Sequence, residues 1–121
     1  MDVLQVREYL GEDKIIGVSA QTVQQAVQAE KSGADYLGVG AVFSTSTKAD
    51  ADYVSRDTLR EICSVVHIPV CAIGGIGREN LPKLSQTGID GVALVSAIFA
   101  ARDIRQECVI LRELSMEMIK K

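Results

Sequence analysis

The sequence predicts an α/β fold built around a parallel sheet, and three observations support this prediction. Four short apolar runs have the length of strands and are nearly continuous, as expected for strands that are buried on both faces. These runs lie at residues 15–19, 35–40, 68–75 and 90–96. Segments with the period of an α-helix separate them. SGADYLGVG at 32–40 also resembles TGIDGVALV at 87–95, and such tandem units are typical of βα repeats.

Three helices are expected in the first half of the chain. A short one occupies residues 3–10. The next spans 22–33 and ends at Gly33, because glycine favours the left-handed conformation that follows many helices. The third spans 55–66, with Ser55 as its N-cap. Its buried face would hold Leu59, Ile62 and Val66.

Two further helices are expected in the second half. The first spans residues 78–88, with Pro82 near its start, where proline is tolerated, and Gly88 at its end. The second is a long amphipathic helix at about 102–121. Its apolar residues are Ile104, Val109, Leu111, Leu114 and Met118.

Two architectures use four strands that are each followed by a helix. One is an open, doubly wound sheet, and the other is a (β/α)₈ barrel. Because a whole barrel takes about 250 residues, the length of 121 residues alone favours the open sheet.

The composition narrows the class of function. With 47% hydrophobic and 24% charged residues, the chain is typical of a globular protein, and its net charge of −3 argues against nucleic-acid binding. No apolar run approaches the roughly 20 residues that span a bilayer, and the polar N-terminus is unlike a secretory signal. The cysteines, Cys63, Cys71 and Cys108, lack metal-binding or disulfide spacing, so free thiols and a cytoplasmic location are expected.

Polar side chains follow the first two strands. Ser19 ends the first, and the alternative to a ligand-binding role is an N-cap of the next helix. The second continues as GVGAVFSTSTKAD, which crowds four hydroxyl side chains against Lys48 with no acid among them. This chemistry suits an oxyanion such as phosphate, although a solvated polar loop has a similar composition.

The last two strands end in a second sequence pattern that suits phosphate binding. Gly74 and Gly75 would let a phosphate approach backbone N–H groups without a Cβ in the way. Val95 and Ser96 would begin a helix directly after the last strand. Glycines on one strand and a short helix on the next match the phosphate cradle of many barrels.

The remaining candidate residues are expected to have structural roles. His67 is the only histidine and has no obvious carboxylate partner in the sequence, so a surface position is expected. Cys71 would pack inside a strand. Asp35 and Asp90 precede strands, at the end opposite the ligand site, and would accept hydrogen bonds from local backbone N–H groups.

Taken together, IIGVSAQT, GADYLGVGAVFSTSTK, PVCAIGGI and GVALVSAI resemble the thiamine-phosphate synthase family of (β/α)₈ enzymes. The likeness covers nearly the whole chain. This likeness overturns the expectation of an open sheet. Residues 1–121 would form a single partial domain, the C-terminal half of a TIM barrel that comprises strands five to eight.

The resemblance implies that pyrophosphate is displaced from hydroxymethylpyrimidine diphosphate by the nitrogen of a thiazole phosphate. Ser19 and Lys48 would hold the diphosphate, with Lys48 as the catalytic residue that stabilises charge on the leaving group. The thiazole phosphate would be bound by Thr45, Thr47, Gly75, Val95 and Ser96.

The family's diphosphate motif and its Mg²⁺ aspartates belong to the first four strands and are absent from this sequence, so the chain alone is expected to lack ligation activity. A half barrel also leaves an apolar face and two strand edges uncovered, which predicts pairing with a second copy or a complementary N-terminal half. Two alternatives are a non-catalytic phosphate-binding half barrel and a thiazole tautomerase-like isomerase. The second is disfavoured because Ala41 stands where those proteins have a histidine.

Overall fold

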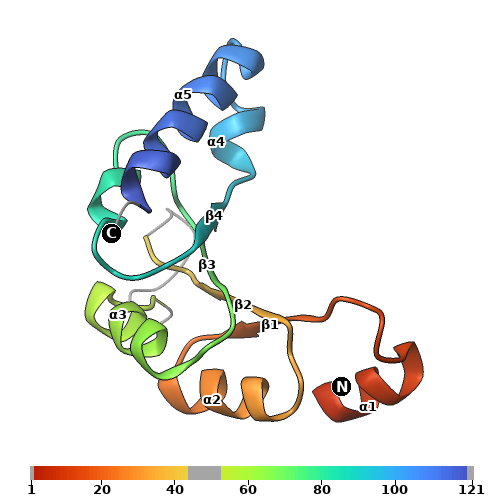
Figure 1. Cartoon of the computed structure of the whole chain (residues 1–121). Helices are drawn as coiled ribbons and strands as arrows, with labels where there is room; N and C mark the ends of the chain where they lie inside the picture. The colour runs from red at the N-terminus through yellow and green to blue at the C-terminus, as the bar shows by residue number, and fades with distance from the viewer. Residues whose placement is uncertain (1, 44–52, 120–121) are drawn as a thin grey trace.

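The computed structural model describes residues 2–43 and 53–119 and shows a bent molecule around one parallel sheet (Figure 1). The strands are β1 (Gly17–Ala20), β2 (Tyr36–Gly40), β3 (Val70–Ile73) and β4 (Gly91–Ala93). All neighbours are parallel, in the order β1-β2-β3-β4. The four expected strands are therefore confirmed. This sequential order lacks the reversal that defines a doubly wound sheet, so the argument from length alone was wrong.

Helices follow the strands as expected, with one exception. The α-helices are α1 (Val3–Leu10), α2 (Val23–Lys31), α3 (Arg56–Val65), α4 (Ser96–Phe99) and α5 (Ile104–Met118). The helix expected at 78–88 is only a single 3₁₀ turn, η2 (Leu81–Leu84). Pro82 lacks an N–H to extend this turn, and Gln86 adopts a positive φ of 67° soon after it.

Side-chain caps set where the helices begin. The hydroxyl of Ser55 accepts a hydrogen bond from the N–H of Thr58 at 3.1 Å, which confirms the expected N-cap of α3. Thr22, and not Ser19, caps α2 by accepting from the N–H of Gln25. Ser19 is thereby left without the capping role.

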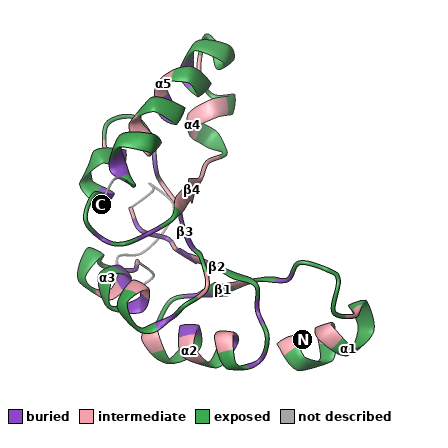
Figure 2. Cartoon of the chain, in the orientation of Figure 1, coloured by how far each residue is buried: buried purple, intermediate pink, exposed green. Residues whose placement is uncertain are grey.

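The core lies between one face of the sheet and the helices. Leu37 and Val39 of β2 are fully buried and belong to the same apolar cluster as Leu59 and Ile62 of α3. Figure 2 shows buried residues along β1, β2 and β3 and on α2, α3 and α5, whereas β4, α1 and α4 have none. In α5 the core residues are Leu111 and Met118. Two other apolar residues of α5, Ile104 and Val109, are exposed.

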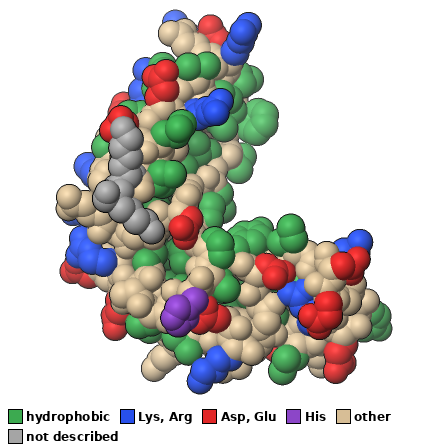
Figure 3. Space-filling view, viewed as in Figure 1, with side chains coloured by type: hydrophobic (Ala, Val, Ile, Leu, Met, Phe, Trp, Pro, Cys, Tyr) green, Lys and Arg blue, Asp and Glu red, His purple; other side chains and the backbone are tan. Residues whose placement is uncertain are grey.

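The opposite face of the sheet has no helices over it in the described chain (Figure 1). Because side chains alternate along a strand, this face carries the residues between the buried ones. They are Gly17, Ser19, Tyr36, Gly38, Gly40, Cys71, Ile73, Gly91 and Ala93. Tyr36 and Ile73 are 43% and 44% exposed, and hydrophobic side chains follow the inside of the bend (Figure 3).

Two aspartates connect neighbouring strands by the same pair of hydrogen bonds. The carboxylate of Asp35 accepts from the N–H of Ile16 at 2.7 Å, and the N–H of Asp35 donates to the carbonyl of Ile16 at 2.8 Å. Asp90 makes the equivalent bonds with Val70, both at 2.9 Å. The repeated Gly-x-Asp sequence thus forms the same structure twice. Both aspartates accept from backbone N–H groups as expected, but the expectation of local partners was wrong, because the donors lie 19 and 20 residues earlier, at the start of the neighbouring strand. We call each arrangement an aspartate clamp.

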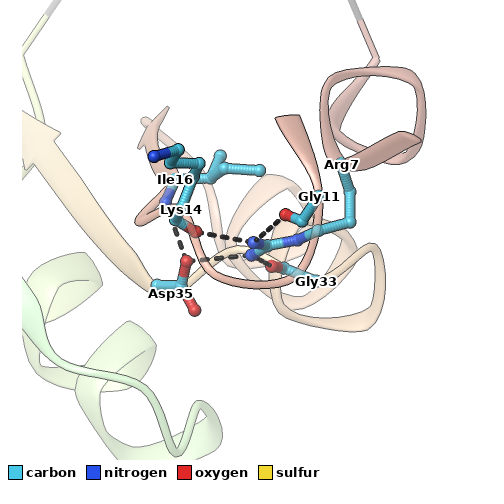
Figure 4. A network of polar contacts seen from close by, with 6 residues as sticks. All are labelled: Arg7, Gly11, Lys14, Ile16, Gly33 and Asp35. Atoms are coloured by element: carbon cyan, nitrogen blue, oxygen red, sulfur yellow. Dashed lines mark hydrogen bonds and ion pairs between the residues drawn. The ribbon is translucent and has the colours of Figure 1, made fainter. Parts of the chain in front are cut away.

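Arg7 attaches α1 to the first clamp (Figure 4). Its guanidinium donates to the carbonyls of Gly11, Lys14 and Gly33 at 3.2, 2.7 and 2.7 Å, and to the Asp35 carboxylate at 2.8 Å. Arg7 and the N–H of Ile16 together lower the pKa of Asp35.

Asp90→Ala is expected to lower the free energy of unfolding by about 1–2 kcal/mol, because it leaves the buried Val70 N–H without its acceptor. Asp13→Ala, which removes an exposed carboxylate from the turn before β1, is the control and should change little. Urea denaturation followed by circular dichroism measures both variants. Equal stability of the two would show that the second clamp contributes nothing.

Candidate phosphate-binding site

The carboxyl ends of the parallel strands form one edge of the sheet, which is where this class of fold binds ligands. The structure places Ser19 in β1, Gly75 two residues after the end of β3, Val95 two residues after the end of β4, and Ser96 at the start of α4. The remaining predicted residues, Thr45, Thr47 and Lys48, lie outside the described residues.

Gly74 and Gly75 form a turn that only glycine accommodates well. Their φ angles are +102° and +66°, in the left-handed region that disfavours other residues. A Cβ on Gly74 would lie 2.5 Å from the Cβ of Ala41, and one on Gly75 would lie 2.8 Å from the carbonyl oxygen of Phe43. The glycines therefore also permit close packing against the segment after β2, a reason that the sequence pattern did not show.

Backbone hydrogen bonds hold the described residues on either side of the hydroxyl-rich segment, residues 44–52. The N–H of Phe43 donates to the carbonyl of Gly74 at 3.2 Å, and the N–H of Val54 donates to the carbonyl of Ala41 at 2.8 Å. The described residues that flank 44–52 are therefore attached at the carboxyl ends of β2 and β3.

An open pocket of about 490 Å³ lies between the glycine turn and the start of α4, with Gly75 and Ser96 both in its lining. Within residues 2–43 and 53–119, no group accepts a hydrogen bond from the N–H of Gly75, Ser96 or Ala97. Such N–H groups are suited to binding an anion. Two of the residues predicted for phosphate binding are thus brought together.

The other two described candidates lie outside this lining. Val95 is 67% exposed and precedes α4 directly. Ser19 is exposed and lines a separate pocket with Val18 and Gln25, beside α2. The described part of the chain therefore contains one candidate anion pocket and, apart from it, a single polar side chain on β1.

Asn80 was not predicted as a site residue, although it lines the pocket. Its side-chain N–H donates to the carbonyl of Gly75 at 2.8 Å, and its oxygen accepts from the N–H of Gly77 at 2.8 Å. These bonds run backward along the chain, whereas the familiar Asx turn bonds the backbone two residues further on, so the sequence contains no clear signal for this role.

Arg78 and Glu107 also line the pocket and form a bidentate ion pair. Arg78 Nε donates to Glu107 Oε2 at 2.9 Å, and its Nη2 contacts Oε1. Hydrogen bonding to Arg78 lowers the pKa of Glu107, whose side chain is only 11% exposed. The pair joins the segment after the glycine turn to α5. The two residues are far apart in sequence, so no local pattern indicates the contact.

The prediction that His67 lacks a carboxylate partner was wrong. Glu30 of α2 lies 3.5 Å from its Nδ1 and accepts from the N–H groups of His67 and Ile68 at 2.6 and 3.0 Å. The backbone hydrogen bond from His67 is the main cause that lowers the pKa of Glu30. The histidine side chain is exposed as expected, at the amino end of β3 and away from the pocket.

Neither thiol nor metal chemistry is indicated in the described chain. Burial raises the pKa of the half-buried Cys71 thiol, which makes it a weaker nucleophile. No three His, Cys, Asp or Glu side chains among residues 2–43 and 53–119 are grouped to hold a metal ion. No helix in the same ranges is long and apolar enough to cross a membrane.

Comparison with known proteins gives consistent results. The family model described as thiamine monophosphate synthase matches residues 1–98. The chain is 52% identical over 103 residues to thiamine-phosphate synthase of Clostridium tetani, covering 85% of this chain and 49% of that protein. It is 46% identical over 121 residues to the synthase of Clostridium acetobutylicum, covering 100% of this chain and 56% of that protein. The chain thus spans about half the length of these relatives.

A solved structure is also similar. Thiamine phosphate pyrophosphorylase from Pyrococcus furiosus matches with a TM-score of 0.89 and 40% identity, over 99% of this chain and 57% of that one. The four-stranded α/β arrangement therefore occurs in a protein of the same named class.

Gly74→Ala is expected to lower the free energy of unfolding by about 1–3 kcal/mol, because it adds both a left-handed penalty and a clash with Ala41. Gly38→Ala is a matched control, since its Cβ would meet nothing within 4 Å. The control should be neutral or stabilising by about 0.5 kcal/mol. Chemical denaturation measures both variants, and equal effects would contradict the role assigned to the turn.

Arg78→Gln is expected to lower the Tm at neutral pH, because Glu107 loses the partner that keeps it ionised. The pKa of Glu107 is lowered from its usual 4.5, so the pair stabilises the fold fully above pH 4.5. That contribution disappears as the pH falls through the lower, folded-state pKa, and the Tm difference should shrink there. Scanning calorimetry from about pH 7 to about pH 3.5 measures this trend.

Arg60→Gln is the control for that experiment, because the Arg60–Asp57 pair is exposed, with side chains 56% and 94% accessible. It should leave the Tm nearly unchanged. A Tm difference for Arg78→Gln that stays constant with pH would contradict the importance of the ion pair.

Proposed function

The chain belongs to the thiamine monophosphate synthase family, and we propose that it acts in thiamine biosynthesis at the joining of hydroxymethylpyrimidine diphosphate to thiazole phosphate. The observation that carries this proposal is the pocket that Gly75 and Ser96 share, because the family's substrates are both phosphorylated. The structure pairs none of the three cysteines in a disulfide, which supports a cytoplasmic location for this activity.

We infer that the four strands are strands five to eight of an eight-stranded barrel, so that residues 1–121 form a partial domain. The sequential order of the strands and the 57% coverage of the Pyrococcus furiosus structure support this inference. The uncovered sheet face, with Tyr36 and Ile73 exposed, supports pairing with a complementary N-terminal half or with a second copy.

Each substrate is assigned its own set of residues. Thr45 and Thr47 would bind the thiazole phosphate together with the backbone of Gly75 and Val95 and with Ser96, through both its N–H and its hydroxyl. The described anchor supports this assignment, because Phe43 is attached to Gly74 and Thr45 follows Phe43 by two residues. Holding both substrates next to each other supplies much of the rate enhancement, since it replaces a bimolecular encounter by an oriented one.

Lys48 and Ser19 are assigned to the diphosphate of the pyrimidine substrate. The C–O bond to the diphosphate breaks to leave a pyrimidine carbocation, and the thiazole nitrogen donates its electron pair to that carbon. Lys48 would stabilise the negative charge that develops on the departing pyrophosphate. Ser19 is exposed on the strand end and is therefore accessible to a substrate.

The family's magnesium does not fit the residues described here, because they contain no cluster of metal-binding side chains. No step of the proposed mechanism uses a metal ion bound by this chain. The isomerase alternative is not favoured, because Ala41 is buried against Gly74 and the relatives named above are synthases.

The chain should bind thiazole phosphate in isothermal titration calorimetry, and Ser96→Ala should weaken that binding about five- to tenfold if its hydroxyl contacts the phosphate. Ser64→Ala is the matched control, because the Ser64 hydroxyl donates to the Glu61 carbonyl on the remote helix α3. Absence of binding by the unsubstituted chain would contradict the proposed site.

A ligation assay tests the catalytic part of the proposal. The chain alone should form no thiamine phosphate, whereas addition of an N-terminal half from a relative should restore formation. Lys48→Ala should abolish the restored reaction and leave thiazole phosphate binding unchanged. Undiminished ligation by Lys48→Ala would refute the role given to this lysine.

A further inference from the structure

The side chain of Asn80 connects two points of the glycine turn. Its N–H donates to the carbonyl of Gly75 and its oxygen accepts from the N–H of Gly77, each at 2.8 Å. Asn80 also lines the pocket that Gly75 and Ser96 share. One neutral side chain therefore acts on the backbone of the turn as both donor and acceptor.

These bonds restrict Gly75 in a specific way. Glycine has the widest choice of backbone conformations, so its own chemistry does not fix its N–H direction. The peptide before Gly75 is held through the Gly74 carbonyl, which accepts from Phe43 at 3.2 Å. The peptide after it is held through the Gly75 carbonyl, which accepts from Asn80. Both peptide groups that flank the residue are thus fixed by hydrogen bonds.

We propose that Asn80 is a positioning residue for phosphate binding, which holds the Gly75 N–H ready to donate to a phosphate oxygen. This inference rests on the proposed function, in which the phosphate of the thiazole substrate occupies the pocket. A preformed donor binds more tightly than a mobile one because less conformational freedom is lost on binding. Asn80 does not touch the phosphate in this proposal and acts only through Gly75.

The chemistry favours asparagine over aspartate at this position. Aspartate would keep the acceptor for Gly77 but would turn a carboxylate oxygen toward the Gly75 carbonyl, where a donor is needed. It would also add a negative charge to a pocket whose lining already includes Glu79 and Glu107, with Arg78 as the cation that pairs with Glu107. That charge would repel a phosphate.

The test compares Asn80→Ala, Asn80→Asp and Thr87→Val in the full chain. Thr87 is a matched control, because its buried hydroxyl donates to the Leu84 carbonyl at 2.7 Å in the same segment without contacting the glycine turn. Three probes are titrated by calorimetry: thiazole phosphate, the corresponding thiazole alcohol and inorganic phosphate. Amide NMR spectra of each titration report the response of the Gly75 N–H.

Asn80→Ala is expected to bind thiazole phosphate about tenfold more weakly than the unsubstituted chain, and Asn80→Asp more weakly still. Affinity for the alcohol should not change, because the alcohol has no phosphate for Gly75 to contact. Thr87→Val should match the unsubstituted chain in all three titrations, even where its Tm falls.

Unchanged phosphate affinity in Asn80→Ala would overturn the inference while the proposed function stands. Equal losses of affinity for the phosphate and the alcohol would show that Asn80 only stabilises the turn. That result would also overturn the inference. If thiazole phosphate does not bind but inorganic phosphate shifts the Gly75 signal, the proposed function fails, and the phosphate titrations of the variants still decide the role of Asn80. No response of Gly75 to either phosphate would overturn both.

Discussion

The aspartate clamps are the interaction on which the arrangement of the sheet depends. Each clamp joins the start of one strand to its neighbour through a carboxylate and a backbone N–H, from Asp35 to Ile16 and from Asp90 to Val70. Because side chains alternate along a strand, a shift of register by one residue would exchange the two faces of the sheet. In the β1–β2 and β3–β4 pairs, the clamps therefore help to fix, from the amino end, which residues reach the candidate ligand-binding edge at the other end.

The proposed phosphate pocket relies on backbone groups more than on charged side chains. Its one described ion pair, between Arg78 and Glu107, is internally neutralised and connects the segment after the glycine turn to α5. The N–H of Gly75 is then placed by hydrogen bonds from Phe43 and Asn80 to the carbonyls on either side of it. A rigid framework around a few free N–H groups is well suited to an anion, because the donors need little reorganisation on binding.

Helix caps formed between neighbouring residues were predictable, whereas irregular turns and contacts between distant segments were not. Ser55 was expected to cap a helix because its hydroxyl reaches the N–H three residues on, and it does so. Asn80 and the Glu30–His67 contact were missed, since the first acts within an irregular turn and the second joins residues 37 apart. The helix expected at 78–88 failed because an apolar period alone does not show that Pro82 and a positive φ at Gln86 end the turn.

The uncovered face of the sheet is notable for how little volume its side chains occupy. A Cβ on Gly38 or Gly91 would meet nothing within 4 Å, and the space beside Gly17 is already filled by the ring of Tyr36. Protein interiors pack at a density of about 0.74, so any element that covers this face must supply most of the atoms. Recognition there would consequently be governed by the shape and bulk of the covering element, and large side chains on its surface would be tolerated better than on a face that was already full.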